Sequence, residues 1–198
     1  RLVKYLLREK ISPKIADLRM ATLILVMFTA ALRYEEAAAI DLRNIETLAS
    51  GNIYITLRKG KCNQLAKDQV IILPKADAGV ERDLDVTQLL HRYTTTLKSL
   101  EDKVTLQDIE RLEGLGGSAK LLFPGFKPGY KLQELWKLDV PFSYCTARRT
   151  LLDAVKASGI KIKSQNGPLG LHSFRVGALT AAAGSGRFSS IQLASLGR

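Results

Sequence analysis

The sequence has little cysteine, with only Cys62 and Cys145 among its 198 residues. The two lie far apart and neither belongs to a CxxC pair, so the spacing indicates neither a zinc site nor a disulfide framework. Two free thiols of this kind are typical of a protein that resides in a reducing compartment.

Long hydrophobic runs are also missing. The longest, residues 21–32, is too short to span a bilayer, and Arg19 and Arg33 flank it. We therefore expect a buried core helix there and no contact with a membrane. The first residues do not form a charged-then-apolar leader, so no secretory signal is expected.

Several common catalytic patterns are absent as well. No glycine-rich phosphate loop precedes a helix with the required spacing, and there is no GxSxG nucleophile elbow. Asp83 and Asp85 flank a leucine at the start of an expected helix, where capping explains them, so no carboxylate cluster indicates a two-metal nuclease.

Acidic residues are scarce relative to basic ones. The 19 Asp and Glu residues oppose 30 Lys and Arg residues, which gives a formal net charge of +11. A globular chain this basic usually binds a polyanion such as nucleic acid. A merely soluble basic protein, or a basic scaffold bound to an acidic partner protein, would have the same balance, so charge alone favours nucleic acid only modestly.

The sequence does contain helical patterns interrupted by one β-hairpin, and hydrophobic residues make up 46% of it. β-Branched runs bounded by glycine and proline predict antiparallel strands, and the lack of βαβ alternation argues against a doubly wound sheet. We expect an α+β, mainly α-helical fold with a small antiparallel β-sheet and a hairpin at about residues 52–73. The expected helices cover residues 2–10, 13–33, 34–40, 86–100, 143–157, 172–183 and 189–195, and the expected strands cover residues 52–57, 69–73 and 121–124.

His172 and Arg175 are three residues apart on one expected helix, so their side chains share a face. Arginine can donate two hydrogen bonds to a phosphate and stays charged, and histidine can transfer a proton near neutral pH. The pair therefore indicates phosphoryl-transfer chemistry. A histidine at a helix N-terminus beside a salt-bridged arginine explains the pair without any function, and for this pair alone that interpretation would be favoured.

Arg33 ends the longest apolar run, where a charge is costly unless it has a partner, and Glu36 one turn later is the obvious one. The two form either a plain helix-end ion pair or a rigid support that points the guanidinium at an anion. With His172 and Arg175, this second arginine makes phosphoryl transfer on nucleic acid the leading hypothesis.

Basic residues also mark the hairpin tip and one later helix. Lys61 lies at the tip beside Arg58 and Lys59, where most lysines are simply solvated but one can reach a bound backbone and protonate a leaving oxygen. Arg148 and Arg149 project from the helix expected at residues 143–157. We predict that Arg58, Lys59, Arg148 and Arg149 bind DNA.

Four segments, in order, resemble the catalytic domain of tyrosine recombinases, the phage-integrase family. They are residues 29–36 with Arg33 and Glu36, the hairpin lysine at Lys61, residues 171–175 (Leu-His-Ser-Phe-Arg), and residues 191–198, which end in Leu-Gly-Arg. The likeness runs from about residue 12 to residue 198, and four segments in order are specific where each alone is weak. Residues 61–64 and 172–177 are most similar to recombinases of eukaryotic mobile elements of the crypton and DIRS type.

The resemblance implies a site-specific recombinase or integrase core that acts in DNA recombination, integration and transposition. A tyrosine would attack a DNA phosphate and become linked to its 3′ end, with no metal or other cofactor. Arg33 and Arg175 would neutralise the transition state, His172 would assist proton movement, and Lys61 would protonate the departing 5′ oxygen. A second strand end would then attack the phosphotyrosine.

The resemblance also implies the organisation and partners of the protein. Residues 1–198 are expected to form a single catalytic domain that stops before the C-terminal nucleophile segment and lacks the N-terminal DNA-clamping domain. Double-stranded DNA is the expected partner, bound by a homo-tetramer. A mobile-element protein of a eukaryote would act in the nucleus, and otherwise in the cytoplasm or nucleoid.

The sequence departs from the family pattern at two places. Ala31 stands where the family often has glycine, and no tyrosine follows Tyr144. The chain as given is therefore expected not to cleave DNA by itself. A catalytically inactive DNA-binding module and a type IB topoisomerase-like enzyme are the alternatives, and the presence of all four predicted catalytic residues favours a recombinase over a module retained only for binding.

Overall fold

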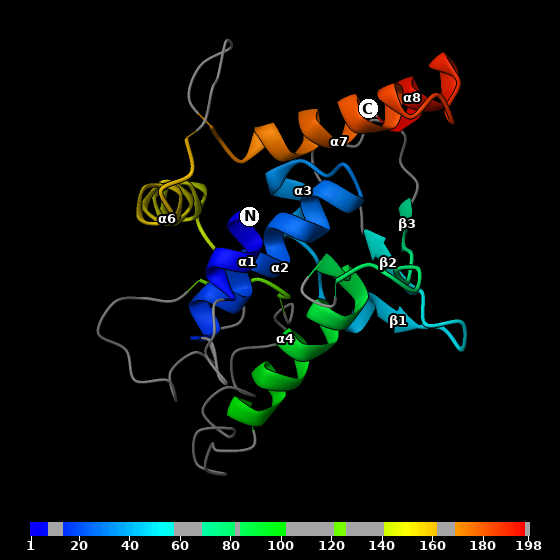
Figure 1. Cartoon of the computed structure of the whole chain (residues 1–198). Coiled ribbons are helices and arrows are strands. Elements are labelled where there is room, and N and C mark those ends of the chain that lie inside the picture. Colours follow the sequence, from blue (N-terminus) through cyan, green and yellow to red (C-terminus); the bar gives the residue numbers. More distant parts are fainter. Residues whose placement is uncertain are drawn as a thin grey trace.

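The computed structural model describes residues 1–7, 14–57, 69–81, 84–101, 121–125, 141–161 and 169–196, and Figure 1 shows their arrangement. The helices are α1 (Leu2–Leu6), α2 (Ile15–Thr29), α3 (Tyr34–Ala38), α4 (Val86–Glu101), α6 (Tyr144–Ala157), α7 (His172–Gly184) and α8 (Ser190–Leu196). A 3-10 turn, η1 (Leu42–Asn44), precedes the strands β1 (Ile45–Thr47), β2 (Ile53–Leu57) and β3 (Gln69–Leu73).

Helix α2 is the centre of the molecule. It is apolar on nearly all sides, and a helix of that kind is stable only when it is surrounded by other elements. Its buried residues include Met20, Leu23 and Met27, and it contacts α1, α3, α4, α6 and α7. Figure 1 shows α6 on one side of this central helix, α7 above it, and α4 and the sheet on the remaining sides. The prediction of a central core helix is confirmed.

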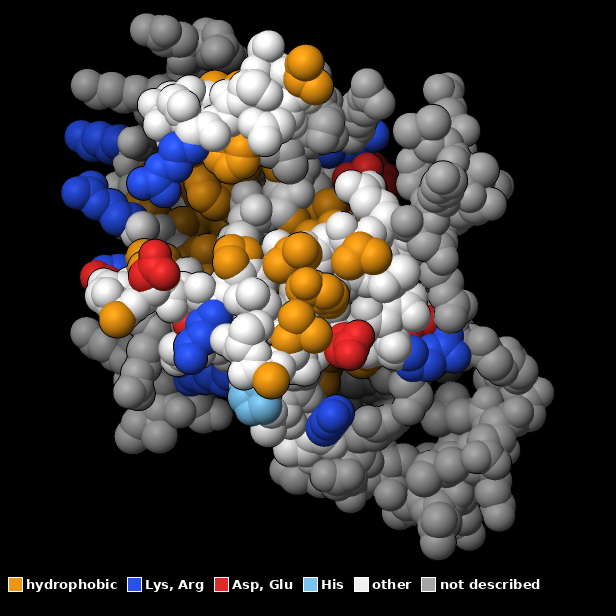
Figure 2. Space-filling view, turned by 90° about the vertical axis from the view of Figure 1, so that its right-hand side faces the viewer, with side chains coloured by type: hydrophobic (Ala, Val, Ile, Leu, Met, Phe, Trp, Pro, Cys, Tyr) orange, Lys and Arg blue, Asp and Glu red, His pale blue; other side chains and the backbone are white. Residues whose placement is uncertain are grey.

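Within the described residues, the sheet has three antiparallel strands in the order β1-β2-β3. Alternation places Ile53, Ile55 and Leu57 of β2 on the buried face, and Ile55 lies opposite Ile71 of β3. The other face is open among the described residues, and Figure 2 shows hydrophobic side chains gathered on this side of the molecule. The expected hairpin at residues 52–73 is thus confirmed in its two strands, whereas its tip, residues 58–68, lies outside the described residues.

The third strand is not the expected one. Residues 121–124 form only isolated bridges, between Asp41 and Leu121 and between Pro124 and Pro141. Ile45–Thr47 pairs with β2 instead, directly after η1. These three residues are too few to show the alternating pattern from which a strand is predicted. They form a strand because they pair with β2, and not because of their local propensity.

The helices of the second half agree closely with expectation. Ser143 accepts a hydrogen bond from the backbone N–H of Thr146, 3.2 Å away, and so caps α6 as predicted. Helix α6 ends before Gly159, which has a φ of +64°, a conformation that glycine adopts without strain. No helix in the described part of the chain is long and apolar enough to cross a membrane.

Candidate active site

Arg33 lies in the short link between α2 and α3, and the way α2 ends determines its direction. The Leu32 N–H donates to the Met27 carbonyl at 3.0 Å and the Ala31 N–H to the Phe28 carbonyl at 3.4 Å. These are the two bonds of a Schellman helix end, which requires a left-handed residue between them. Ala31 fills that position with a φ of +51°. The helix therefore stops at Thr29, short of the predicted Arg33, and Arg33 follows in an extended conformation.

Glu36, on the first turn of α3, has a carboxylate with three contacts. Its Oε2 accepts a hydrogen bond from the backbone N–H of Arg33 at 2.7 Å, and its Oε1 lies 3.6 Å from the Arg33 guanidinium. The same Oε2 lies 3.4 Å from Nη1 of Arg175 on α7. One acid therefore holds both the backbone and the side chain of Arg33, and it also joins Arg33 to Arg175.

Arg175 is buried, with only 4% of its side chain exposed, whereas 44% of the Arg33 side chain is exposed. Burial and the nearby positive charge of Arg33 lower the pKa of Arg175, and the Glu36 carboxylate opposes this shift. Because both guanidinium groups lie within 3.6 Å of the same Glu36 carboxylate, they share one local electrostatic environment. The structure thus brings together two arginines from distant parts of the sequence.

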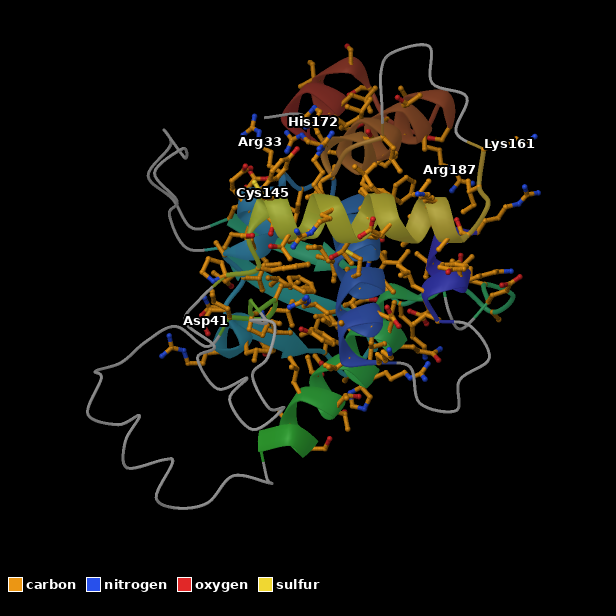
Figure 3. The ribbon with its side chains drawn as sticks, turned by 90° about the vertical axis from the view of Figure 1, so that its left-hand side faces the viewer. Arg33, Asp41, Cys145, Lys161, His172 and Arg187 are labelled. Atoms are coloured by element: carbon orange, nitrogen blue, oxygen red, sulfur yellow. The ribbon has the colours of Figure 1, made fainter. Side chains whose placement is uncertain are left out.

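His172 begins α7, one turn before Arg175, and its side chain is exposed while that of Arg175 is buried. Figure 3 shows Arg33 and His172 on the same side of the molecule, above the end of α6 that carries Cys145. An exposed imidazole on this side of the molecule can exchange a proton with a bound ligand. The expected association of His172 with the arginine pair is therefore compatible with this geometry.

The remaining predicted site residues divide into two groups. Arg148 and Arg149 are exposed on α6, whose N-terminal end lies beneath Arg33 in Figure 3. Lys61, Arg58 and Lys59 lie outside the described residues. The catalytic role of Lys61 and the DNA contacts of Arg58 and Lys59 therefore stay predictions.

For two residues near the site, the sequence alone predicted no role. Tyr34, next to Arg33, is 6% exposed and donates a hydrogen bond from its hydroxyl to the Phe142 carbonyl. Arg19, on the mainly apolar α2, is 3% exposed and donates from Nη1 to the Pro124 carbonyl at 2.5 Å. A charge within an apolar helix was the one signal that could have identified Arg19, because such a charge requires buried acceptors.

No family model matches this sequence, and no curated protein matches it. Solved structures do resemble its fold, among them two of one recombinase. One is the XerH site-specific recombinase bound to difH substrate in a pre-cleavage complex, with a TM-score of 0.60 and 16% identity over 98% of this chain. The other is XerH bound to palindromic difH substrate in a post-cleavage complex, with a TM-score of 0.58 and 17% identity over 97% of this chain.

These comparisons show the fold. The chain is mostly helical with a three-stranded antiparallel sheet, like the part of the XerH recombinase on which it superimposes. It spans 43% and 42% of the length of the two XerH chains. At 16% and 17% identity, the likeness concerns architecture, and activity has to be argued from the residues of this chain.

Proposed function

We propose that this chain is the catalytic core of a DNA strand transferase of the tyrosine-recombinase type, which cleaves and rejoins double-stranded DNA. The observation that carries the proposal is the convergence of Arg33 and Arg175 on the carboxylate of Glu36. Two guanidinium groups on one side of a molecule with a net charge of +11 form a site for a single phosphodiester. The fold shared with XerH, a site-specific recombinase bound to its difH substrate in both solved structures, supports the same assignment.

The two arginines would contribute differently. Arg33 is exposed and meets the phosphate directly, whereas Arg175 meets it only if the groups around its guanidinium move apart when the phosphate binds. Aimed positive charge stabilises the extra negative charge of the pentavalent transition state more than that of the ground state. Glu36 keeps both guanidinium groups oriented and offsets part of their mutual repulsion.

The covalent step we propose joins a tyrosine oxygen to phosphorus as the bond from phosphorus to the 5′ oxygen breaks. His172 assists movement of the tyrosine proton, and Lys61 protonates the departing 5′ oxygen. No tyrosine follows Arg175 among the 198 residues given, and the step as proposed uses a tyrosine supplied by a further segment. Attack by a second strand end on the phosphotyrosine then releases the protein.

The narrower assignments rest on the sequence segments already described. We propose a mobile-element recombinase of the crypton or DIRS type because residues 61–64 and 172–177 resemble that group. A tetramer on DNA and action in the nucleus follow from that proposal. Arg148 and Arg149 on α6 and Arg58 and Lys59 on the hairpin are the proposed contacts to flanking DNA.

The test is a covalent-adduct assay on the protein together with its nucleophile segment, using a nicked duplex that traps the intermediate, in EDTA. We expect an adduct that resists denaturant, and its loss in Arg33→Ala and Arg175→Ala with much of the DNA affinity retained. Arg43→Ala is the matched control, because Arg43 is 49% exposed and has its own acid, Asp41, at 2.6 Å. An adduct that requires magnesium contradicts the mechanism, and DNA binding without any adduct supports a binding module instead.

A further inference from the structure

Tyr34 links the turn that carries Arg33 to the chain that leads into α6. Its hydroxyl donates to the Phe142 carbonyl, 108 positions along the sequence. Its ring packs edge-to-face on that of Tyr144, the first residue of α6, with centroids 5.3 Å apart and planes at 80°. An aromatic pair of this geometry adds a direction-dependent contact to the hydrogen bond. Tyr34 therefore touches two of the three residues at which α6 begins.

Phe142 is itself held from other directions. The guanidinium carbon of Arg19 lies 3.6 Å from the centroid of its ring, a cation–π contact. Its N–H donates to the Phe123 carbonyl at 3.0 Å, and its side chain is 2% exposed. Because Phe142 is fixed in this way and Ser143 then caps α6, the Tyr34 hydroxyl is attached to a rigid point. A displacement at either end of this bond is transmitted to the other.

We propose that Tyr34 is a positioning residue whose hydroxyl fixes Arg33 relative to the N-terminal end of α6. The inference rests on the proposed function, and it adds a residue that the sequence had not indicated. Arg33 and Tyr34 are consecutive, so the backbone that orients the Arg33 side chain is held by Glu36 on one side and by Phe142 on the other. The phosphate site of Arg33 and the basic face of α6, with Arg148 and Arg149, thereby form one surface of fixed geometry.

The chemistry of the hydroxyl suits this role. Burial raises the pKa of Tyr34 to about 12, with Arg19 opposing and Glu35 reinforcing the shift, so the group stays a neutral donor at any working pH. Phenylalanine at this position would keep the ring and its contact with Tyr144. It would leave the buried Phe142 carbonyl without the Tyr34 donor. The chain around Phe142 would then tend to shift so that this carbonyl finds another hydrogen-bond donor.

Tyr93 on α4 provides a matched control. It is also buried, at 0% exposure, it is also near Arg19, and burial raises its pKa. Its ring stacks on Phe123, at a centroid distance of 5.8 Å. Within the part of the chain that the structure describes, its hydroxyl has no hydrogen-bond partner. Tyr93→Phe therefore removes a buried hydroxyl group without removing a hydrogen bond. Tyr34→Phe removes a buried hydroxyl group together with its hydrogen bond to the Phe142 carbonyl.

The first experiment measures single-turnover DNA cleavage and DNA affinity separately, in the protein with its nucleophile segment. Tyr34→Phe is expected to lower the cleavage rate at saturating DNA by roughly 10- to 100-fold, because misplacement of a reacting group by up to about 1 Å has an effect of that size. The DNA affinity is expected to change by less than about threefold. Tyr93→Phe is expected to leave both quantities close to wild type. A Tyr34→Phe protein that is less stable but cleaves at the wild-type rate overturns the positioning role.

Two further measurements separate this inference from the proposed function. If Arg33→Ala and Arg175→Ala cleave normally, the proposed function fails whatever Tyr34 does; if they are inactive and Tyr34→Phe is normal, only the positioning role fails. The second readout needs no activity: in ¹⁵N spectra the Arg33 Nε–H resonance is expected to shift in Tyr34→Phe and not in Tyr93→Phe. An Arg33 resonance that is the same in both variants contradicts the inference even in a protein that does not cleave DNA.

Discussion

At the scale of single residues, the carboxylate of Glu36 has two cationic neighbours with very different exposure. Arg33 faces solvent, whereas Arg175 is 4% exposed and would be an expensive isolated charge. Glu36 is itself only partly covered, at 31% exposure of its side chain. It can therefore stabilise Arg175 from the edge of the site while leaving the outer side of Arg33 open to a ligand.

Glu36→Gln tests this role because it keeps the size of the side chain and removes its charge. We expect cleavage to fall by roughly 10- to 100-fold as the arginines lose their orientation, while DNA affinity is unchanged or tighter because one negative charge is gone. Glu35→Gln, next in sequence and exposed, makes the same change in net charge without touching either arginine. Single-turnover rates and binding titrations that are alike for the two variants would contradict the account.

Ala31 carries the backbone strain of the site, because it is a non-glycine residue with a φ of +51°. Ala31→Gly is expected to raise the free energy of unfolding by about 0.5–1 kcal/mol, since relief of the left-handed penalty exceeds the added freedom of the unfolded chain. Ala181→Gly, at an exposed position in the last turn of α7, should lower the same free energy by up to about 1 kcal/mol. Urea unfolding measures both, and a loss of stability in Ala31→Gly would contradict the strain argument.

At the scale of elements, α6 connects the arginine site to the proposed DNA contacts. Arg148 and Arg149 are exposed on it, and Tyr34 and Ser143 fix its N-terminal end. A double-stranded ligand at Arg33 would continue along this helix, because the end of α6 that carries Cys145 lies on the same side of the molecule as Arg33 and His172 (Figure 3). Arg148 and Arg149 follow Cys145 within about one turn of α6. Phosphate contacts of this kind bind any sequence and depend strongly on salt.

Arg148→Ala with Arg149→Ala is expected to weaken DNA binding similarly for all sequences. The slope of log affinity against log salt should become shallower by up to about 2, one phosphate contact for each arginine. Arg92→Ala with Lys98→Ala removes the same charge from exposed positions of α4, which lies away from α6 in Figure 1. Equal effects of the two double variants in salt titrations would show that only net charge matters.

The elements also show how much of the fold the sequence could predict. Helices α2, α4, α6 and α7 and strands β2 and β3 were predictable, because their hydrophobic periodicity and their flanking Ser, Gly and Pro residues are local signals. The predicted end of α2 was four residues too late. Glycine usually marks a Schellman helix end in a sequence, and here alanine occupies that position. Strand β1 exists because β2 pairs with it, which is a tertiary effect.

At the scale of the whole molecule, the site depends on contacts that no local pattern specifies. Glu36 and Arg175 are 139 positions apart, and their meeting requires α3 and α7 to pack around the same end of α2. Sequence order and resemblance indicated which arginines to consider, but the buried state of Arg175 and the link from Tyr34 to Phe142 depend on three-dimensional packing. The role of Lys61 remains a prediction, since it lies outside the described residues.

The central claim is that Arg33 and Arg175 bind one and the same phosphate group. Titration with inorganic phosphate, followed by the arginine side-chain resonances in ¹⁵N spectra, tests it without knowledge of the DNA target or of the nucleophile. The account predicts that the Nε–H signals of Arg33 and Arg175 move together with a single dissociation constant, while that of Arg43, paired with Asp41, stays in place. Movement of Arg33 alone, or two unrelated dissociation constants, would contradict it.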